Sequence, residues 1–251
     1  MRILNIDVDD TTSAALLETL VRGVVVTPNV DHLMKLQKDA RFLAAYRAAD
    51  YRLCDSRIVQ LASGWVAPRP IREQIAGSDF FPAFCRHHGR ADSDVRIFLL
   101  GGSTGEAVER ARLALNRDTA REVVVGGYSP PFGFERDPEE CQRIHQRIQT
   151  SGANTLAVGV GAPKQELWIA ANRAPLPAIR LFFAVGATID FVGGDARRAP
   201  KWLTRIGLEW AHRLLQEPRR MAKRYLVDDL PFFWLILQQR RGRYRDPFAG
   251  I

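Results

Sequence analysis

The side chains best suited to chemistry follow short apolar runs that read as strands. Asp55 comes directly after one such run, where a carboxylate in a partly dry crevice can act as a general base. Thr27 and Asn29 follow another and could hydrogen-bond a sugar or a phosphate. Each has a structural alternative, because loop Asp residues often cap or form turns, and Thr27 and Asn29 flank a proline.

The stretch Leu156–Asn172, LAVGVGAPKQELWIAAN, has the local design of an anion site. An apolar run predicts a buried parallel strand, Gly161 breaks it, and a helix is expected from Lys164. Small residues in such a turn let backbone approach a ligand, and the helix N-terminus presents N–H groups to it. Gln165 lies on the first turn, where its side chain could reach over the strand end. An ordinary strand–helix turn that binds nothing is the alternative.

A third candidate is the GGST sequence from Gly101 to Thr104, which resembles a phosphate cradle before a helix. It lacks the lysine of a P-loop, so ATP hydrolysis is not supported. Tyr128 and Asp190 follow further predicted strands and are also candidate binding residues. No His or acidic cluster has the spacing of metal ligands, and no G-x-S-x-G motif supports a serine hydrolase.

Strands and helices are expected to alternate along the chain. The residue patterns predict strands at Arg2–Val8, Gly23–Thr27, Asp50–Cys54, Val95–Leu100, Glu122–Gly126, Leu156–Val160 and Ile179–Val185. They predict helices ending near Leu20, His88 and Asn116, and over Val30–Ala49, Ile58–Gly64 and Asp137–Ser151. This alternation favours an α/β fold, a doubly wound, mostly parallel Rossmann-like sheet. Ligands of such sheets bind at the C-terminal ends of the strands, where the candidates recur.

Composition narrows the class of protein further. The chain has 251 residues and is 46% hydrophobic, enough for a sizeable core. Its three cysteines are scattered, which indicates a reducing compartment and no zinc motif. We find no apolar run of 18 residues, and the start MRILNIDVDD is not a signal peptide.

Most of the net charge of +8 lies near the C-terminus, where Asp195–Ile251 contains 13 Lys/Arg and 6 Asp/Glu. Lys201–Leu215 is amphipathic, and the apolar run Leu230–Leu237 has arginines on both sides. Such a segment could lie in a membrane interface with its arginines on anionic headgroups. A core-packing helix with a solvated basic end is the alternative. We therefore expect a core over residues 1–195 and a basic helical membrane-docking appendage over residues 196–251.

Several motifs occur together in an order that resembles the WecG/TagA/CpsF glycosyltransferases (glycosyltransferase family 26). They are TPN at Thr27–Asn29, the acid Asp55, GSD at Gly77–Asp79, LLGG at Leu99–Gly102, GAPKQELW at Gly161–Trp168 and the long run Gly186–Arg220. The resemblance implies transfer, with inversion, from a UDP-sugar to a polyprenyl-diphosphate-linked saccharide. It also implies a peripheral location on the cytoplasmic face of the bacterial inner membrane and no metal or other cofactor.

The resemblance also implies roles for individual residues. Asp55 would be the catalytic base on the acceptor hydroxyl, with Thr27 also catalytic and Asn29 and Gln165 in the active site. Without a metal, cationic side chains and helix N-termini must neutralise the leaving diphosphate. The candidates for that role are Lys164, Arg213, Arg219, Arg220 and Arg224. The sequence departs from the family at Ser56, where glycine is common.

Several alternatives stay open. The donor sugar could be glucose, N-acetylmannosamine or its uronic acid, and the xanthan- or acetan-type exopolysaccharide glucosyltransferases are one subgroup to consider. The +7 of the C-terminal segment also fits a nucleic-acid-binding protein, although no such motif occurs and the run FFWLIL interrupts the arginines. A non-catalytic nucleotide-sugar sensor is a further alternative. We expect no nucleic-acid partner and leave a homo-oligomer open.

Overall fold

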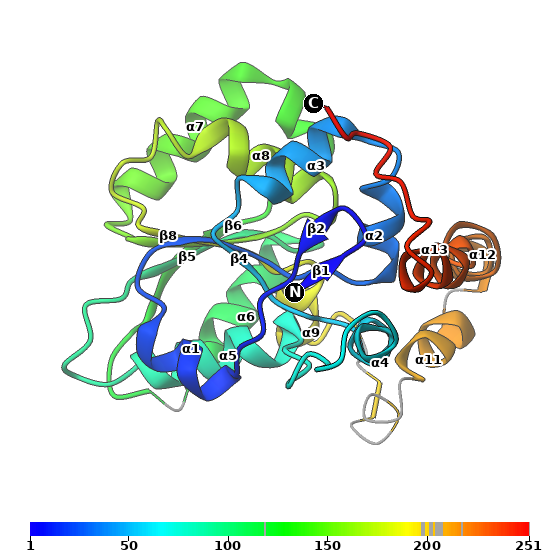
Figure 1. Cartoon of the computed structure of the whole chain (residues 1–251). Helices are drawn as coiled ribbons and strands as arrows, with labels where there is room; N and C mark the ends of the chain where they lie inside the picture. Colours follow the sequence, from blue (N-terminus) through cyan, green and yellow to red (C-terminus); the bar gives the residue numbers. More distant parts are fainter. Residues whose placement is uncertain (118, 197–198, 201–202, 204–207, 217, 251) are drawn as a thin grey trace. The chain divides into compact units, whose positions relative to one another are not determined.

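The computed structural model describes residues 1–117, 119–196, 199–200, 203, 208–216 and 218–250 (Figure 1). The chain forms two compact units. The first unit consists of Met1–Ser13, Thr27–Ala76 and Arg198–Ile251, and the second of Ala14–Val26 and Gly77–Arg197. The expected core over residues 1–195 and appendage over residues 196–251 stay predictions.

A parallel sheet organises the second unit and confirms the α/β, Rossmann-like fold. In the described part of this unit, five strands pair in parallel, in the order β3 (Gly23–Val26), β8 (Leu181–Ala184), β7 (Thr155–Gly159), β5 (Ile97–Gly101) and β6 (Val124–Tyr128). The middle strands are buried along their whole length, because helices cover both faces of the sheet.

Most helices of the second unit lie between successive strands along the chain, and α9 follows the last strand, β8. They are α1 (Ser13–Thr19), which begins at the last residue of the first unit, α5 (Gly77–His88), α6 (Gly105–Asn116), the short η1 (Phe134–Arg136), α7 (Pro138–Thr150), α8 (Lys164–Asn172) and α9 (Thr188–Gly193). Helices α7 and α8 cover one face of the sheet, and α5 and α6 the other (Figure 1). Side chains fix the helix starts: Asp137 accepts hydrogen bonds from two backbone N–H groups of α7, and Pro138 occupies its first turn.

Aromatic rings fasten α5 to the sheet. The ring of Phe183 on β8 lies 5.0 Å from that of Phe84 and 5.5 Å from that of Phe81, both in edge-on arrangements. Each of these rings is almost completely buried. Such pairs add specific geometry to the hydrophobic burial that holds the helix in place.

The first unit carries short strands and most of the C-terminal helices. Its strands are β1 (Arg2–Ile3), β2 (Ile6–Asp7) and β4 (Tyr51–Arg52). Its helices are α2 (Val30–Lys35), α3 (Ala40–Arg47), α4 (Arg57–Val66), α11 (Glu209–Gln216), α12 (Pro218–Lys223), the π-helix η2 (Arg224–Asp228) and α13 (Pro231–Arg240).

Two expected elements of the first unit are wrong in detail. The strand expected over Arg2–Val8 is an antiparallel hairpin of β1 and β2, because Leu4 adopts the left-handed conformation (φ 51°) and turns the chain. The single helix expected over Val30–Ala49 is two helices. Asp39 has extended backbone, and its side chain accepts from two N–H groups of α3, so a new helix starts there.

In the second unit, the strand expected over Glu122–Gly126 begins and ends two residues later, as β6. The strand therefore includes Gly127, where a side chain would not fit, because a Cβ there would lie 2.3 Å from Val108. Helix α9 was not expected from the sequence.

In the first unit, part of the helix expected over Lys201–Leu215 lies outside the described residues, and α11 covers its described end.

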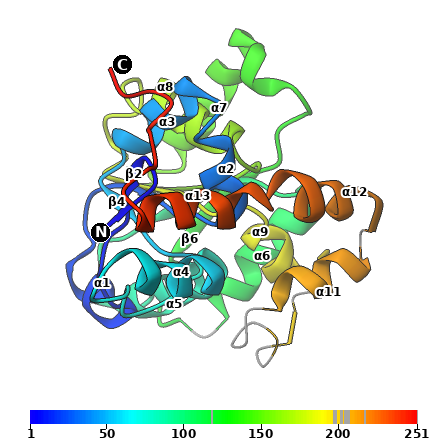
Figure 2. The same ribbon diagram turned by 45° about the vertical axis from the view of Figure 1, so that its right-hand side comes forward.

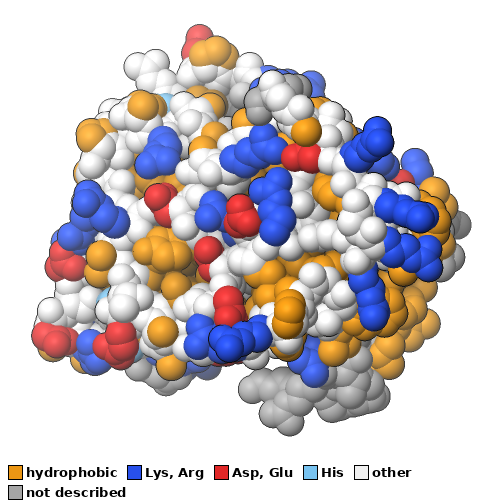
Figure 3. All heavy atoms as spheres, viewed as in Figure 1, with side chains coloured by type: hydrophobic (Ala, Val, Ile, Leu, Met, Phe, Trp, Pro, Cys, Tyr) orange, Lys and Arg blue, Asp and Glu red, His pale blue; other side chains and the backbone are white. Residues whose placement is uncertain are grey.

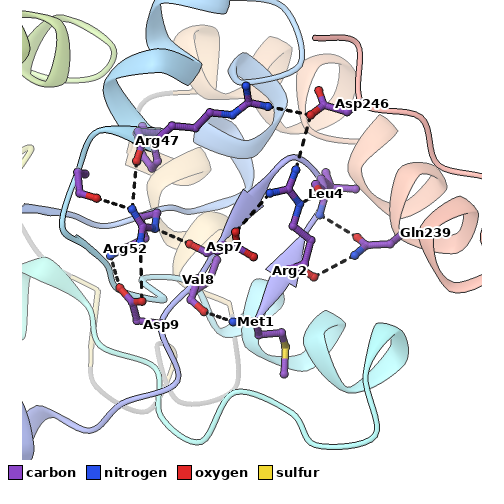
Figure 4. A network of polar contacts seen from close by, with 12 residues as sticks. Met1, Arg2, Leu4, Asp7, Val8, Asp9, Arg47, Arg52, Gln239 and Asp246 are labelled. Atoms are coloured by element: carbon purple, nitrogen blue, oxygen red, sulfur yellow. Dashed lines mark hydrogen bonds and ion pairs between the residues drawn. The ribbon is translucent and has the colours of Figure 1, made fainter. Parts of the chain in front are cut away.

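Polar contacts tie the C-terminal segment to the N-terminal hairpin within the first unit (Figure 4). The Gln239 side chain accepts from Leu4 N–H at 2.8 Å and donates to Arg2 C=O at 2.9 Å. Asp246 pairs with Arg47 at 2.9 Å and with Arg2 at 3.6 Å. The last described residues are therefore part of the folded first unit.

Helix α13 has one buried and one exposed face. Phe232 and Ile236 are buried where α13 packs against α4 and α2. Phe233 and Trp234 are more than half exposed. Figure 3 shows hydrophobic side chains beside basic ones over α13 and α12. Among the described helices, none combines the length and apolar character needed to cross a membrane.

Candidate functional site

Asp55 is held at the start of α4 by contacts of its own backbone. Its N–H donates to Pro28 C=O at 3.2 Å, and its C=O accepts from the Gln74 side chain at 2.8 Å. The residue is half-buried. These contacts fix the main chain on both sides of the carboxylate, which gives Asp55 the defined position that a general base needs.

Ser56 fits this turn without strain. Its φ of −107° and ψ of 131° are extended backbone, which every residue adopts, so the turn does not require the glycine common in the family. Beside it, Cys54 is buried, and its thiol contacts Ser56 C=O at 3.6 Å. Burial, together with the Asp55 charge, raises the pKa of the Cys54 thiol to about 12. Cys54 is therefore a packing residue and not a nucleophile.

Thr27 and Asn29 lie in the first unit with Asp55, on the segment whose Pro28 contacts the Asp55 backbone. Asn29 is the N-cap of α2, and its Oδ1 accepts from His32 N–H at 3.1 Å. This bond orients the amide and leaves its Nδ2 as the group that could donate to a substrate. Both side chains are half-buried.

In the second unit, neighbouring strand ends approach too closely for side chains. A Cβ on Gly101 would lie 2.3 Å from Gly159 C=O, and one on Gly159 would lie 2.7 Å from Gly186 C=O. Gly101 and Gly102 also have positive φ values of 136° and 83°. Gly161 has a φ of 83° with open space where its Cβ would be. This edge therefore presents backbone, as expected of a site that receives a diphosphate.

Gln165 is buried on the first turn of α8 and braces this edge. Its Oε1 accepts from Gly186 N–H at 3.0 Å, and its Nε2 donates to Glu166 at 2.9 Å. Both ends of the amide are thus bonded within the protein. The structure supports a role in holding the Gly186 turn more directly than a role in contacting substrate.

The GGST sequence is held by two aspartates. Ser103 N–H donates to Asp190 at 2.7 Å, and the Ser103 hydroxyl donates to Asp195 at 2.8 Å. Thr104 is the N-cap of α6, since its hydroxyl accepts from Ala107 N–H at 3.1 Å. Asp190 and Thr104 therefore shape the loop, in which Gly101 is buried and Gly102 is half-buried.

Tyr128 lies at the end of β6 with a fixed ring. Its hydroxyl donates to the buried Glu140 at 2.7 Å, and this hydrogen bond raises the pKa of the phenol. The Arg147 guanidinium lies 4.5 Å from the ring centroid on one face. A ring held in this way is suited to stacking on a planar group through its remaining surface.

Lys164 begins α8, and its ammonium lies 4.7 Å from the centroid of the Phe132 ring. Phe132 is 99% exposed, in the loop after β6. The pair provides a cation and an apolar face in the same part of the second unit.

The arginines expected to face the diphosphate are seen only in part. The side chains of Arg213, Arg219 and Arg220 lie outside the described part of the structure. Arg224 is described, and its guanidinium lies 3.4 Å from Asp31 and 3.8 Å from Asp229. Because both partners are buried carboxylates, Arg224 holds η2 against α2 within the first unit.

Three residues that hold the candidate site residues in place were not predicted from the sequence. Gln74, Glu140 and Asp195 carry no motif of their own, and their partners lie between 12 and 92 positions away. For Asp195 there was a signal, because it belongs to the long run Gly186–Arg220 that carries the family resemblance. In the described residues, no group of three or more His, Cys, Asp or Glu side chains is placed to hold a metal ion.

Each unit, taken by itself, carries candidate groups for a different part of the chemistry. The first has a positioned carboxylate with a hydroxyl and an amide, and the second has close-packed glycine turns, a fixed aromatic ring and a lysine. A carboxylate can deprotonate an acceptor hydroxyl, and backbone-lined turns suit an anionic leaving group. The sequence model of the Glycosyl transferase WecG/TagA/CpsF family matches residues 1–246. The chain therefore belongs to this family of glycosyltransferases, which are involved in cell-surface polysaccharide biosynthesis.

Proposed function

We propose that the protein transfers a sugar, with inversion, from a UDP-sugar to a polyprenyl-diphosphate-linked saccharide. The observation that carries the proposal is Asp55, at a family motif position and held by its backbone on both sides. A single displacement needs one base on the acceptor hydroxyl, and Asp55 supplies a suitable group. We assign Thr27 and the Nδ2 of Asn29 to hydrogen bonds with the sugars.

The donor's diphosphate is assigned to the second unit. Gly101, Gly102 and Gly161 present backbone there, and Lys164 adds a positive charge. Tyr128 supplies a ring for the nucleobase or sugar. Asp190 and Gln165 act by holding the loops that carry these groups. A metal-independent reaction is part of the proposal, with Lys164 and appendage arginines neutralising the leaving group.

A peripheral location on the cytoplasmic face of the bacterial inner membrane completes the proposal. The exposed Phe233 and Trp234 on α13 lie in a segment that continues into Arg240, Arg241, Arg243 and Arg245. Aromatic residues beside arginines are typical of helices that lie in a membrane interface. The candidate donor sugars are glucose, N-acetylmannosamine and its uronic acid, and the xanthan- or acetan-type glucosyltransferases are the subgroup to consider.

UDP release by the purified protein tests the reaction. The donors are UDP-glucose, UDP-N-acetylmannosamine and its uronic acid, each with a short-chain polyprenyl-diphosphate-sugar acceptor, with and without EDTA. We expect acceptor-dependent release from one donor, unchanged by EDTA. Detectable UDP binding without release from any pair would favour a nucleotide-sugar sensor. Loss of release with EDTA would contradict the metal-independent step.

The basic C-terminal segment supports one rival function, nucleic-acid binding. Salt-dependent binding of an oligonucleotide that UDP does not compete would favour it. We expect no such binding at physiological salt, because the segment has no nucleic-acid-binding motif and contains the concentrated apolar run FFWLIL.

A further inference from the structure

A groove runs along α4 in the first unit, and none of the residues assigned above lines it. It encloses about 780 Å³ between α4 and the loop Pro68–Arg72, with Asp10 also in its wall. We call it the α4 groove. Three of its lining residues are arginines: Arg57, Arg69 and Arg72.

Buried hydrogen bonds fix the two walls of the α4 groove to each other. The Gln60 side chain on α4 donates to Ile71 C=O and Arg72 C=O, both at 3.1 Å. The Ser63 hydroxyl accepts from Ile71 N–H at 2.9 Å. Gln60, Ser63 and Ile71 are all buried. The arginines therefore project from a preformed wall, which lowers the entropy cost of binding a ligand.

The α4 groove has an excess of positive charge. Its one lining carboxylate, Asp10, is engaged by Arg72, whose Nε lies 3.2 Å from Oδ1 and whose backbone N–H donates to the same oxygen. These hydrogen bonds lower the pKa of Asp10. Arg57 donates to the neutral Gln60 side chain at 2.5 Å, and Arg69 is exposed. Two guanidinium charges thus remain for an anion, and the guanidinium fork matches phosphate.

Exposed apolar side chains on the same helix distinguish this place from an ordinary anion site. Leu61 is 56% and Trp65 is 61% exposed, and they are one turn apart on α4. Helix α13 packs against α4 and adds the exposed Phe233 and Trp234 (Figure 2). Tryptophan is enriched at membrane–water interfaces because it has an apolar body and a polar N–H.

We propose that the α4 groove binds the phosphate of an anionic phospholipid headgroup, with Leu61 and Trp65 in the boundary between headgroups and acyl chains. Cationic and apolar groups beside each other match an amphiphile. A nucleic-acid duplex would match the arginines but would leave the apolar Leu61 and Trp65 exposed to water. Binding that does not require anionic lipid would indicate a protein partner. The inference deepens the proposed function and rests on it only in taking the acceptor to be lipid-linked. Asp55 lies two residues before Arg57, so docking through α4 would hold the start of this helix at the membrane.

Vesicle co-sedimentation of the full chain tests the charge. We compare Arg57→Gln/Arg69→Gln with Lys38→Gln/Arg41→Gln, which removes two exposed charges outside the groove. On phosphatidylglycerol/phosphatidylcholine vesicles, the groove variant should bind at least about tenfold more weakly and the control nearly as wild type. Equal weakening of both variants, or unchanged binding of the groove variant, would overturn the proposal. The wild-type protein is also tested with 10 mM inorganic phosphate on vesicles of phosphatidylcholine alone. If phosphate weakens that binding as much as the groove substitutions weaken binding to the mixed vesicles, the proposal is also overturned.

Tryptophan quenching by brominated lipid tests the apolar part. Replacing Trp65 with Phe should remove a measurable share of the quenching, whereas Trp168→Phe should not, because Trp168 is buried. Equal quenching of wild type and Trp65→Phe would place α4 away from the lipid and overturn the proposal. Neither assay requires sugar transfer, so a protein that binds vesicles through α4 yet releases no UDP would contradict the proposed function alone.

Discussion

At the scale of single residues, backbone contacts and glycines account for most of the candidate site. Asp55 is positioned by its own main chain, and Gln165 by hydrogen bonds at both ends of its amide. At the strand ends, Gly101 and Gly159 are required because adjacent strands leave no room for a side chain. Neighbouring glycines therefore differ in importance, which gives a direct test.

Gly101→Ala should destabilise the protein by at least about 2 kcal/mol, because its Cβ would meet Gly159 C=O at 2.3 Å and its φ is 136°. Gly105→Ala is the matched control. A Cβ there would meet nothing within 4 Å, and alanine favours the helix, so its stability should be unchanged or about 0.5 kcal/mol higher. Urea denaturation followed by circular dichroism measures both. Similar values for the two variants would contradict the described strand contacts.

At the scale of elements, α13 shows how one helix can serve both packing and surface. Phe232 is fully buried, while the next residue, Phe233, is 55% exposed. Phe232→Ala should cost about 3–5 kcal/mol, as for other buried aromatic residues. Phe233→Ala should cost less than about 1 kcal/mol and should weaken vesicle binding instead. Thermal unfolding measures the loss of stability, and vesicle co-sedimentation measures the loss of binding. A large loss of stability in Phe233→Ala and not in Phe232→Ala would contradict the described orientation of α13.

A cluster of charges between η2 and α2 should give the first unit a distinctive response to pH. Burial raises the pKa of Asp229 to about 6. The negative charges of Asp31 and Asp228 also raise this pKa, and the positive charges of Arg224 and Lys35 lower it. Between about pH 4 and 6 the folded state keeps a proton that the unfolded state releases. Rising pH therefore lowers the free energy of unfolding over this range.

Asp229→Asn removes this contribution, so its stability relative to wild type should rise by about 1–2 kcal/mol from pH 4 to 6.5 and stay constant above. His32 acts in the opposite direction, because burial lowers its pKa to about 3, but it is present in both proteins. The difference between the two denaturation midpoints, measured across pH, isolates Asp229. A difference that does not change with pH would contradict the raised pKa.

At the scale of the whole molecule, local patterns in the sequence predict much of the fold and less of the site. The runs at Gly23–Thr27 and Val95–Leu100 are strands because buried parallel strands need continuous apolar residues, and this signal is local. The break at Asp39 depends on one capping side chain, and the α4 groove depends on Gln60 meeting Ile71 across a loop. Contacts of this kind leave no periodic trace in the sequence.

The C-terminal segment illustrates the same limit. Its charge was visible in the sequence, and its packing was not. Phe232, Ile236 and Met221 are buried, and Gln239 and Asp246 bond to the N-terminal hairpin. Deleting Arg197–Ile251 would expose these partners, so lost membrane binding after deletion would not separate docking from unfolding. Surface substitutions at Phe233 and Trp234 make the cleaner test of the docking role.

The most direct test of sugar transfer is acceptor-dependent UDP release by Asp55→Asn, with the exposed Asp92→Asn as control. If Asp55 is the base, release should fall about 10²- to 10⁴-fold while the melting temperature and the affinity for UDP stay those of wild type. The control should keep full activity. Full UDP release by a folded Asp55→Asn variant would contradict the assignment on which the proposed function depends.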